Sequence, residues 1–422
     1  MLDIKLFRDS PEVVREDLRR RKDEEKAAWV DKVISLDQQR RELQQHADAL
    51  RHERNELSQA INRLKKEHKN ADLELARAKE IPLKLKEAEE KEATLASDIK
   101  YLLMRLPNIM HESVPYGKDD SENQSIRSWG IPKVPDFPLL SHGELAEKLG
   151  ADFGRSTKIA GAGFYFLNGK LALLNQALIR FAVDHLVKKG YTYVEPPLIM
   201  KKQSYQGVTD LTDFEKVMYK VEGEDSYLIA TSEHPLIAQF ADEVLEERQL
   251  PIKLCGYSMC FRREIGSHGV DTRGFFRTHQ FNKVEQIILC KPEESWALHE
   301  ELQRNAEALM EKLGLPYRVV NICTGDLGTV AAKKYDIELW MPKQNCYKEG
   351  ASCSNCTGYQ ARRLNIKYRT PDGNHTLHTL NSTAIATSRV LVAILENYQN
   401  QDGSLTVPEA LQPLLGMKRI EP

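Results

Sequence analysis

A hydrophobic repeat of seven residues runs through the N-terminal part of the chain. Sustained apolar heptads of this kind predict a long amphipathic helix that packs along a partner helix. Arg40 and Arg54 interrupt one seam, so the predicted register is imperfect there. The apolar residues of the repeat are Leu36, Leu43, Leu50, Leu57 and Leu64, with Val33, Ala47 and Ile61 on the second seam.

A second apolar repeat follows a polar break near residues 65–72. Two helices of about 35 residues each, joined by a short turn, should pack antiparallel and form an arm roughly 50 Å long. Pro82 should restart or bend the second helix, because a proline inside a helix removes a backbone hydrogen bond. The second repeat consists of Ile81, Ala88, Leu95 and Leu102, interleaved with Leu85, Ile99 and Leu106.

Basic side chains gather near the turn of this predicted hairpin. A locally basic surface can contact phosphates, which would make the tip of the arm a nucleic-acid contact. Periodicity alone favours the plainer interpretation of a structural or oligomerising coiled coil with solvated charged faces. The basic residues are Arg51, Arg54, Arg63, Lys65, Lys66 and Lys69, and they outnumber Glu53, Glu56 and Glu67.

The pattern changes from about Pro115 onward to short strands and amphipathic helices, after a linker rich in proline. The order of these elements favours an antiparallel sheet flanked by helices over repeated parallel crossovers, so the expected fold class is α+β. We expect one domain at residues 1–110, with the arm at about 28–104, and a second domain at residues 111–422. The clearest elements are a helix at Leu171–Lys189 and strands at Tyr191–Glu195, Gln286–Leu289 and Arg318–Asn321.

Composition narrows the classes of protein that remain. A chain of 422 residues is long enough for about two or three domains. Because 60 Lys and Arg residues are balanced by 62 Asp and Glu residues, the net charge of −2 excludes a wholly basic nucleic-acid coat. Seven cysteines fit a reducing compartment better than a disulfide scaffold. The N-terminus lacks the apolar core of a signal peptide and no later run reaches transmembrane length, so we expect a cytoplasmic protein without membrane contact.

The segment Cys260–Gln286 carries the most chemical information in the chain. Two apolar-rich runs bracket a polar loop at Gly266–Gly274, whose glycines permit tight turns. In such a hairpin Arg262 can offer a planar fork to a phosphate and a carboxylate, and Phe281 can stack on a base. The sequence has no glycine-rich phosphate-binding motif, so side chains and a metal ion must hold the phosphates.

Several segments, in order along the chain, resemble the class II aminoacyl-tRNA synthetases. Cys260–Gln286 resembles motif 2, and its run RTHQFNKVEQ is similar to the seryl-tRNA synthetases in particular. Leu186–Ile199 resembles motif 1, and Thr379–Gln399 resembles motif 3. The likeness covers nearly the whole chain and implies a class II catalytic core with an antiparallel sheet, preceded by the helical arm. Further segments similar to seryl enzymes are Thr231–Glu233, Tyr347–Arg363 and Leu106–Pro115.

The resemblance implies a ligase that converts L-serine and ATP to seryl-adenylate and then charges the 3′ end of tRNA(Ser). Arg262 would bridge the substrate carboxylate and the α-phosphate, and Arg389 would contact the outer phosphates, which makes these two the implied catalytic residues. Glu349 and Ser352 match the pair that takes Mg²⁺ together with ATP. The implied ATP-binding residues are Arg262, Arg263, Glu264, Arg277, Thr278, Phe281, Glu349, Gly350, Ala351, Ser352 and Arg389.

For the amino acid, the resemblance implies a small polar pocket that contains two carboxylates. Hydrogen bonds to the serine hydroxyl would reject alanine by roughly 10⁴–10⁵, because the polar groups of the pocket would lose their partners. Thr231–Glu233 alternatively fits a helix N-cap. Ser382 stands where many seryl enzymes have glycine, which limits how closely the backbone can approach a ligand. The implied serine-binding residues are Thr231, Ser232, Glu233, Arg262, Glu285, Asn381 and Thr383.

The resemblance also implies the partners of the protein. The arm would grip the long variable arm of tRNA(Ser) across a homodimer, while the catalytic domain would receive the acceptor stem. The homodimer itself would form through the motif 1 segment, Leu186–Ile199.

Other interpretations stay open at this stage. Cys346, Cys353 and Cys356 could form a structural zinc site with His375 or His378, although reduced packing cysteines fit a seryl enzyme better.

Other class II synthetases and a non-catalytic relative are further alternatives. A phenylalanyl α chain also begins with a coiled coil, whereas threonyl, prolyl and histidyl types need an anticodon domain after motif 3, where only Val390–Pro422 remains. An RNA-binding paralogue without ligase activity is disfavoured by the intact Arg262, Glu285, Glu349 and Arg389. A relative that loads carrier proteins is disfavoured by the arm.

Overall fold

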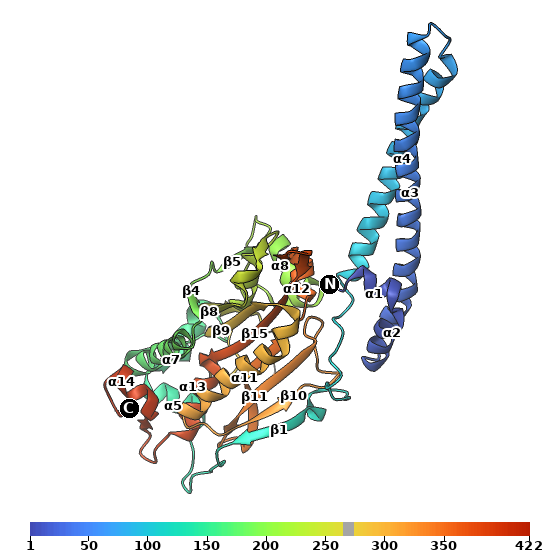
Figure 1. The fold of residues 1–422 in the computed structure, drawn as a ribbon. Helices are drawn as coiled ribbons and strands as arrows, with labels where there is room; N and C mark the ends of the chain where they lie inside the picture. The colour runs from blue at the N-terminus through green and yellow to red at the C-terminus, as the bar shows by residue number, and fades with distance from the viewer. Residues whose placement is uncertain (265–273) are drawn as a thin grey trace. The chain divides into compact units, whose positions relative to one another are not determined.

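The computed structural model describes residues 1–264 and 274–422, in two units that separate between residues 109 and 110. The first unit is helical, and the second is built around a large sheet (Figure 1). In the first unit, α1 (Ile4–Asp9) and α2 (Pro11–Arg20) precede two long helices, α3 (Glu24–Lys66) and α4 (Asp72–Leu103).

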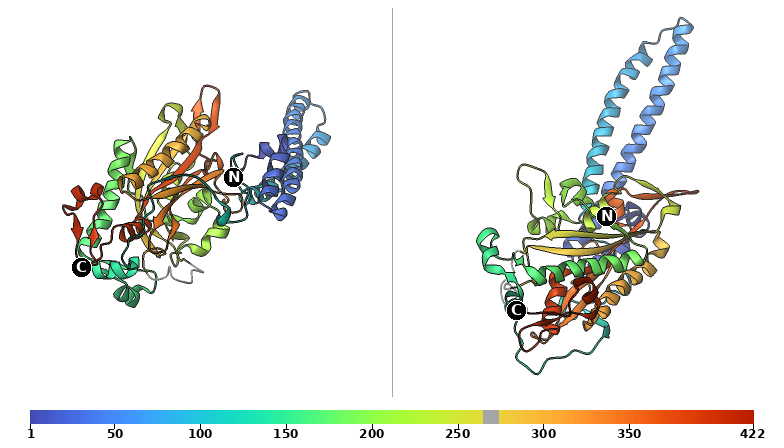
Figure 2. Two further views of the ribbon diagram at one scale, coloured as in Figure 1. Left: turned by 90° about the horizontal axis from the view of Figure 1, so that it is seen from below. Right: turned by 90° about the vertical axis from the view of Figure 1, so that its left-hand side faces the viewer.

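Helices α3 and α4 run antiparallel along each other, which confirms the expected long helical arm (Figures 1 and 2). The backbone N–H of Lys26 donates to the side chain of Asp23 at 3.0 Å and so caps the start of α3. Ala47 and Leu50 of α3 pack against apolar residues of α4, which buries the heptad seam. The residues contributed by α4 are Ile81, Leu85 and Ala88.

Of the two outcomes predicted at Pro82, a restart or a bend, the restart is wrong. Pro82 lies on an exposed position inside α4, which continues from Asp72 to Leu103. A proline in a helix interior costs about 3 kcal/mol. The neighbouring Ile81 and Leu85 are buried against α3, so their packing holds this turn helical and offsets that cost.

A partly buried ion pair ties the base of the arm to the first helix. Arg8 of α1 donates to both carboxylate oxygens of Asp37 on α3, at 2.7 and 2.8 Å. These hydrogen bonds lower the pKa of Asp37, whose side chain is only 2% exposed. Arg41 also approaches Asp37 at 3.2 Å, so basic residues beside the seam have an acidic partner within the same unit.

The second unit is built on an eight-stranded sheet in the order β1-β10-β11-β12-β15-β9-β8-β4. Neighbouring strands are antiparallel except β4 and β8, which are parallel, so the prediction of an antiparallel core is confirmed with one parallel edge pair. The bounds of the strands are β1 (Gln124–Trp129), β4 (Thr192–Val194), β8 (Ile252–Phe261), β9 (Gln280–Cys290), β10 (Tyr317–Asn321), β11 (Lys333–Met341), β12 (Cys346–Asn355) and β15 (His378–Ala386).

Three helices pack against this sheet and share its largest apolar core. They are α7 (Gly169–Lys188), α11 (Ser295–Lys312) and α13 (Thr387–Asn397). Leu178, Leu302 and Leu391, one from each helix, are fully or almost fully buried there. Figures 1 and 2 show α7 and α11 side by side on one face of the sheet, which leaves the side chains of the opposite face available for a site.

The remaining elements are short and surround the sheet. None of the helices in the described ranges is long and apolar enough to cross a bilayer. The short elements are α5 (His142–Leu149), β2 (Ala151–Asp152), α6 (Phe153–Ala160), β3 (Phe166–Leu167), β5 (Ile199–Lys201), α8 (Lys202–Val208), α9 (Leu211–Phe214), β6 (Ser226–Leu228), α10 (Glu233–Ala238), β7 (Val244–Glu246), α12 (Tyr359–Leu364), β13 (Lys367–Thr370), β14 (Gly373–Thr376), β16 (Leu405–Thr406), α14 (Gln412–Leu415) and β17 (Arg419–Ile420).

Candidate active site

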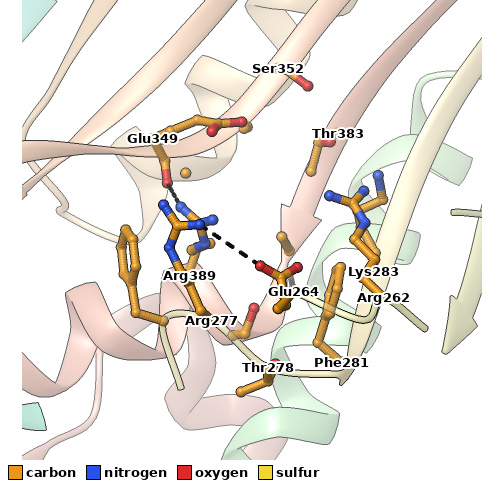
Figure 3. Close-up of a pocket in the computed structure, with 15 residues that line it drawn as sticks. Arg262, Glu264, Arg277, Thr278, Phe281, Lys283, Glu349, Ser352, Thr383 and Arg389 are labelled. Carbon is orange, nitrogen blue, oxygen red and sulfur yellow. Dashed lines mark hydrogen bonds and ion pairs between the residues drawn. The ribbon is translucent and has the colours of Figure 1, made fainter. Parts of the chain in front are cut away.

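A polar cavity lies where β9, β12, β15 and the start of α13 meet (Figure 3). Its open volume is about 100 Å³, well below the roughly 300–1,000 Å³ of typical ligand sites. Side chains therefore fill much of the space that a nucleotide would need. The cavity is lined by Arg262, Glu264, Phe276, Arg277, Thr278, Phe281, Lys283, Glu349, Gly350, Ala351, Ser352, Thr383, Ala386, Ser388 and Arg389.

Arg262 follows the end of β8 and is fixed by its backbone and by one side-chain nitrogen. Its backbone N–H donates to the carbonyl of His279 at 2.9 Å, and its Nε donates to the carbonyl of Ala230 at 3.3 Å. The guanidinium carbon lies 5.4 Å from the centre of the Phe281 ring. The cation therefore stands beside the aromatic face at the wall of the cavity.

Arg389 and Arg277 supply two further cations to the cavity. The Nη1 atom of Arg389 donates to the carbonyl of Glu349 at 2.9 Å, and its guanidinium lies 4.0 Å from the centre of the Phe276 ring. Arg277 forms an ion pair with Glu264 at 3.9 Å (Figure 3). Removal from water lowers the pKa of Arg389, which reflects how crowded this cationic site is.

Glu349 and Ser352 reach the same cavity because β12 contains a bulge. Glu338 and Ile337 of β11 pair with Glu349 and Ala351, so Gly350 is the extra residue between them. Without the bulge, side chains three positions apart would point to opposite faces of the strand. A side chain at Gly350 would also meet the side chain of Leu339 at 2.7 Å, so any larger residue there would force the buried Leu339 to shift.

The charge around Glu349 favours its ionised form. Desolvation opposes ionisation, but the charges of Lys334, Arg389, Arg262 and Lys283 outweigh it and lower the pKa of Glu349. Thr278 differs from Glu349 in having an unused hydrogen-bonding group. Its hydroxyl is buried and finds no hydrogen-bond partner within residues 1–264 and 274–422, as expected of a group that a ligand would satisfy.

A second group of polar residues lies directly behind Thr383. The hydroxyls of Thr231 and Thr383 both donate to Oε1 of Glu285 at 3.2 Å. The side chains of Gln360 and Asn381 both donate to Oε1 of Glu233, at 3.1 and 3.2 Å. Two carboxylates and two hydroxyls are thus held together, which suits a small ligand that carries an ammonium and a hydroxyl.

The environment of Glu233 makes its carboxyl titrate near neutral pH. Removal from water, reinforced by the negative charge of Glu285, raises the pKa of Glu233 to about 7. Lys283, Gln360 and Arg262 act in the opposite direction but do not cancel the rise. A cationic ligand would favour the ionised form of this carboxyl.

Two of the residues expected in the site are placed elsewhere. Arg263 is exposed and does not line the cavity, although its backbone N–H donates to the carbonyl of Val217 at 2.8 Å. The hydroxyl of Ser232 is buried and donates to the carbonyl of Gly256 at 3.1 Å, so it supports the strand rather than facing Glu285. Of the loop expected at Gly266–Gly274, only Gly274 belongs to the described residues.

Ser232 is the N-cap residue of α10 but makes no side-chain capping hydrogen bond, so the N-cap alternative for Thr231–Glu233 holds in position and not in side-chain bonding. The backbone N–H of Glu233 donates to the hydroxyl oxygen of Thr231 at 3.2 Å, while that hydroxyl donates its own proton to Glu285. One threonine therefore supports the start of α10 and faces the second carboxylate.

Sequence reasoning missed Lys283, Phe276 and Gln360. Lys283 stands between Phe281 and Glu285 on β9, and the two-residue alternation of a strand could have placed all three side chains on one face. Phe276 and Gln360 carried no such signal, because the positions they occupy depend on contacts with other elements.

Of the three cysteines considered for zinc, Cys346 is only partly buried. Cys353 and Cys356 are buried, and the Asn381 side chain approaches the sulfur of Cys356 at 3.5 Å. The ring of His378 is hydrogen-bonded to the hydroxyl of Ser295 at 2.9 Å, and the ring of His375 to the hydroxyl of Thr370 at 3.0 Å. In the described part of the chain, no three or more His, Cys, Asp or Glu side chains are grouped so as to hold a metal ion.

The chain is similar over its whole length to several proteins of known class. Residues 1–110 match the seryl-tRNA synthetase N-terminal domain, and residues 216–398 match the tRNA synthetase class II core domain of the G, H, P, S and T enzymes. A serine–tRNA ligase of Methanocella arvoryzae is 58% identical over 419 residues, which are 98% of this chain and 99% of the relative.

Two solved structures have nearly the same fold. Seryl-tRNA synthetase from Pyrococcus horikoshii complexed with ATP has a TM-score of 0.96 and 48% identity, and the match covers 100% of both chains. Cytoplasmic serine–tRNA ligase from Naegleria fowleri in complex with AMP has a TM-score of 0.91 and 37% identity, with 100% of this chain and 99% of that chain covered.

Proposed function

Because the chain belongs to the seryl-tRNA synthetase family, we propose that it activates L-serine with ATP and transfers the seryl group to the 3′ end of tRNA(Ser). One observation supports this most directly. Arg262, Phe281 and Thr383 all line the cavity, and Thr383 connects it to Glu285, whose charge acts on the neighbouring Glu233.

The nucleotide would occupy the end of the cavity near Phe281. Adenine would stack on the Phe281 ring, with Glu264 and the unpartnered hydroxyl of Thr278 available as polar contacts. Arg277 and Arg389 would contact the β- and γ-phosphates, as fixed donors in a charged site. Gly350 and Ala351 would form the floor between them.

Activation requires a carboxylate oxygen of serine to approach the α-phosphorus of ATP. A bond forms between these atoms, the bond from the α-phosphorus to the bridging oxygen breaks, and pyrophosphate leaves. Arg262 would contact both the carboxylate and the α-phosphate, which reduces the repulsion between two anions and orients the attack. No side chain has to accept a proton, because the attacking carboxylate is already ionised.

A divalent cation fits the oxygen ligands at the other wall of the cavity. The bulge at Gly350 places the carboxylate of Glu349 and the hydroxyl of Ser352 on the same side of β12, and hard cations such as Mg²⁺ prefer such oxygens. The low pKa of Glu349 keeps its carboxylate ionised for this role. Bound Mg²⁺ would neutralise part of the phosphate charge.

Serine would place its ammonium between Glu233 and Glu285. Thr231 and Thr383 border the same space, and both hydroxyls donate to Glu285. The hydroxyl of bound serine would form hydrogen bonds with these two threonines. Asn381 would act mainly by orienting Glu233. A substrate without the hydroxyl would leave these buried groups unpaired.

The arm, the dimer and the compartment complete the proposal. Residues 1–110, with a coiled-coil arm at about 28–104, would bind tRNA(Ser), while residues 111–422 would carry out catalysis and receive the acceptor stem. A homodimer would form through the motif 1 segment at the edge of the sheet. Free thiols at all seven cysteines are consistent with the reducing cytoplasm.

Pyrophosphate exchange tests the proposed reaction. The purified protein, given ATP, Mg²⁺ and labelled pyrophosphate, should support strong exchange with serine and much weaker exchange with alanine, threonine or phenylalanine. The change Arg262→Ala should abolish exchange while leaving the thermal unfolding midpoint close to that of the unchanged protein. Strong exchange with phenylalanine or threonine would refute serine as the substrate, and no exchange at all would favour a non-catalytic RNA-binding role.

A further inference from the structure

Lys283 brings a positive charge into the aminoacyl pocket. Its side chain lies on β9 and is only 9% exposed, and its Nζ forms an ion pair with Oε1 of Glu285. That same oxygen accepts the hydroxyls of Thr231 and Thr383. The lysine ammonium therefore sits in the polar surroundings that suit the ammonium of an amino acid.

The lining of the cavity is consistent with this occupation. Lys283 and Thr383 line the open space, whereas Glu285, Glu233 and Thr231 do not. The ammonium of Lys283 thus separates the open cavity from the carboxylate that a substrate ammonium must reach. A bound amino acid and Lys283 cannot both occupy this place, because like charges repel and the pocket is small.

The sequence of side chains along β9 indicates where Lys283 would move. Phe281, Lys283 and Glu285 alternate onto one face of the strand, in steps of about 6.7 Å per two residues. The nucleotide end of the site is at Phe281 and the ammonium end is at Glu285. Lys283 stands midway, where the substrate carboxylate must meet the α-phosphate.

We propose that Lys283 is a catalytic cation with two positions: it rests on Glu285 in the empty site, and the ammonium of serine displaces it toward the carboxylate and α-phosphate. This inference rests on the proposed function and names a further residue for that reaction. The bonds formed and broken are those of serine activation by ATP, and Lys283 acts through its charge. Arg262 alone would otherwise have to balance two anions at the reacting centre.

The displacement would couple chemistry to recognition of the amine. A substrate analogue that has the carboxylate and hydroxyl of serine but no ammonium, such as 3-hydroxypropanoate, would leave Lys283 on Glu285. Its carboxylate would then lack one cation beside the α-phosphate. An amine without a carboxylate, such as ethanolamine, would have to displace Lys283 without giving it an anion to contact.

Binding titrations of the full chain with L-serine and ethanolamine test the exchange of positions. In Lys283→Met the competing ammonium is gone, so ethanolamine should bind about tenfold more tightly than to the unchanged protein. Serine should bind about tenfold more weakly, because its carboxylate has lost a partner. This opposite movement of two affinities is not expected if the lysine only supports the fold.

Three comparison variants keep the test decisive. Lys253→Met removes a lysine of β8 in the same sheet, whose Nζ lies 2.8 Å from both carboxylate oxygens of Glu301 on α11, and it should change neither affinity. Lys283→Arg should retain weak ethanolamine binding. If the unpaired Glu285 destabilises Lys283→Met, the double change Lys283→Met and Glu285→Gln restores charge balance and should lose the gain in ethanolamine affinity.

Kinetics test the catalytic part of the inference. Serine-dependent pyrophosphate exchange by Lys283→Met should show kcat reduced by about 10²-fold at saturating serine, a loss beyond the change in KM. Equal weakening of serine and ethanolamine, or an unchanged kcat, would overturn the two-position role while leaving the proposed function intact. Failure of the unchanged protein to bind serine would overturn both.

Discussion

The chemistry of single residues in this site is set by how the pocket balances charge. Glu285 forms an ion pair with Lys283, whereas Glu233 accepts hydrogen bonds from the amides of Gln360 and Asn381. Removal from water and the charge of Glu285 raise the pKa of Glu233 to about 7, and the opposing effects of Lys283, Gln360 and Arg262 do not cancel that rise. Serine recognition should therefore depend on pH in the neutral range.

The change Glu233→Gln tests this dependence. In the unchanged protein, serine should bind progressively more weakly as pH falls from 8 to 6, because a growing share of Glu233 is protonated and cannot pair with an ammonium. The slope below pH 7 should approach tenfold per unit. Glu233→Gln should bind serine weakly at all these pH values and show little slope, as measured by calorimetric titration. The exposed Glu222→Gln serves as control, and a slope that persists in Glu233→Gln would assign it to another group.

The same carboxyl should also influence stability with a defined sign. Its folded-state pKa of about 7 lies above the ordinary value of 4.5, so the folded state binds the proton more tightly than the unfolded state. The stabilisation is complete below about pH 4.5 and is lost as pH rises through about 7. Denaturant unfolding of Glu233→Gln should lack this part of the decline.

At the scale of elements, the arm is a helical hairpin whose base and tip differ in their contacts. The base is fixed to α1 through Arg8 and Asp37, and the middle is closed by the apolar contacts between α3 and α4. Near the tip, Arg51 is neutralised by Glu89 at 2.7 Å and Lys69 by Glu67 at 2.8 Å. Within the described ranges, no ion pair is formed by Arg54, Arg63, Lys65 or Lys66, so these are the cations best able to contact phosphates.

Removing the distal arm should separate activation from transfer. A chain in which residues 46–89 are replaced by a short glycine linker keeps the Arg8–Asp37 contact and should show normal serine-dependent pyrophosphate exchange. Charging of tRNA(Ser) should fall sharply, because phosphate contacts are lost. The full-length variant with Arg63, Lys65 and Lys66 changed to alanine should weaken charging by about tenfold and reduce its salt dependence. Loss of exchange in the shortened chain would instead make the arm a structural support of catalysis.

At the scale of the whole molecule, one edge of the sheet carries exposed apolar side chains. The strand β4 ends the eight-stranded sheet, and apolar side chains near it are unusually open to solvent. Val187, Tyr193 and Ile199 are 47%, 39% and 48% exposed, and all three lie in the segment that resembles motif 1. Such a group of apolar residues is expected at an interface between two copies of the chain.

Sedimentation velocity of Val187→Asp tests this interface. The unchanged protein should sediment as a dimer. In the variant, the charge buried at the interface should weaken association by about 3 kcal/mol and shift the protein toward monomer. The change Ile131→Asp provides a matched control, since Ile131 is 76% exposed and follows β1 at the opposite end of the sheet. Dissociation by Ile131→Asp alone would place the interface at that other end.

The sequence by itself determined the features that rest on local patterns. The heptads of Leu50 and Ile81 predicted two long helices, because neighbours along a helix recur with a fixed period whatever else surrounds them. Residue types in fixed order also sufficed for the family resemblance and for Arg262, Phe281 and Arg389, which the fold brings to one cavity.

Only the tertiary structure decided how residues from separate elements meet. The bulge at Gly350 that turns Glu349 and Ser352 to one side depends on pairing with β11, and the register of a strand is set by its partner. Gln360 hydrogen-bonds Glu233 although the two residues are 127 positions apart in the chain, so no local sequence pattern predicts this contact. Pro82 stayed helical because α3 packs against its neighbours. The charge on Lys283 was plain in the sequence, but its pairing with Glu285 required the pocket that excludes water from both.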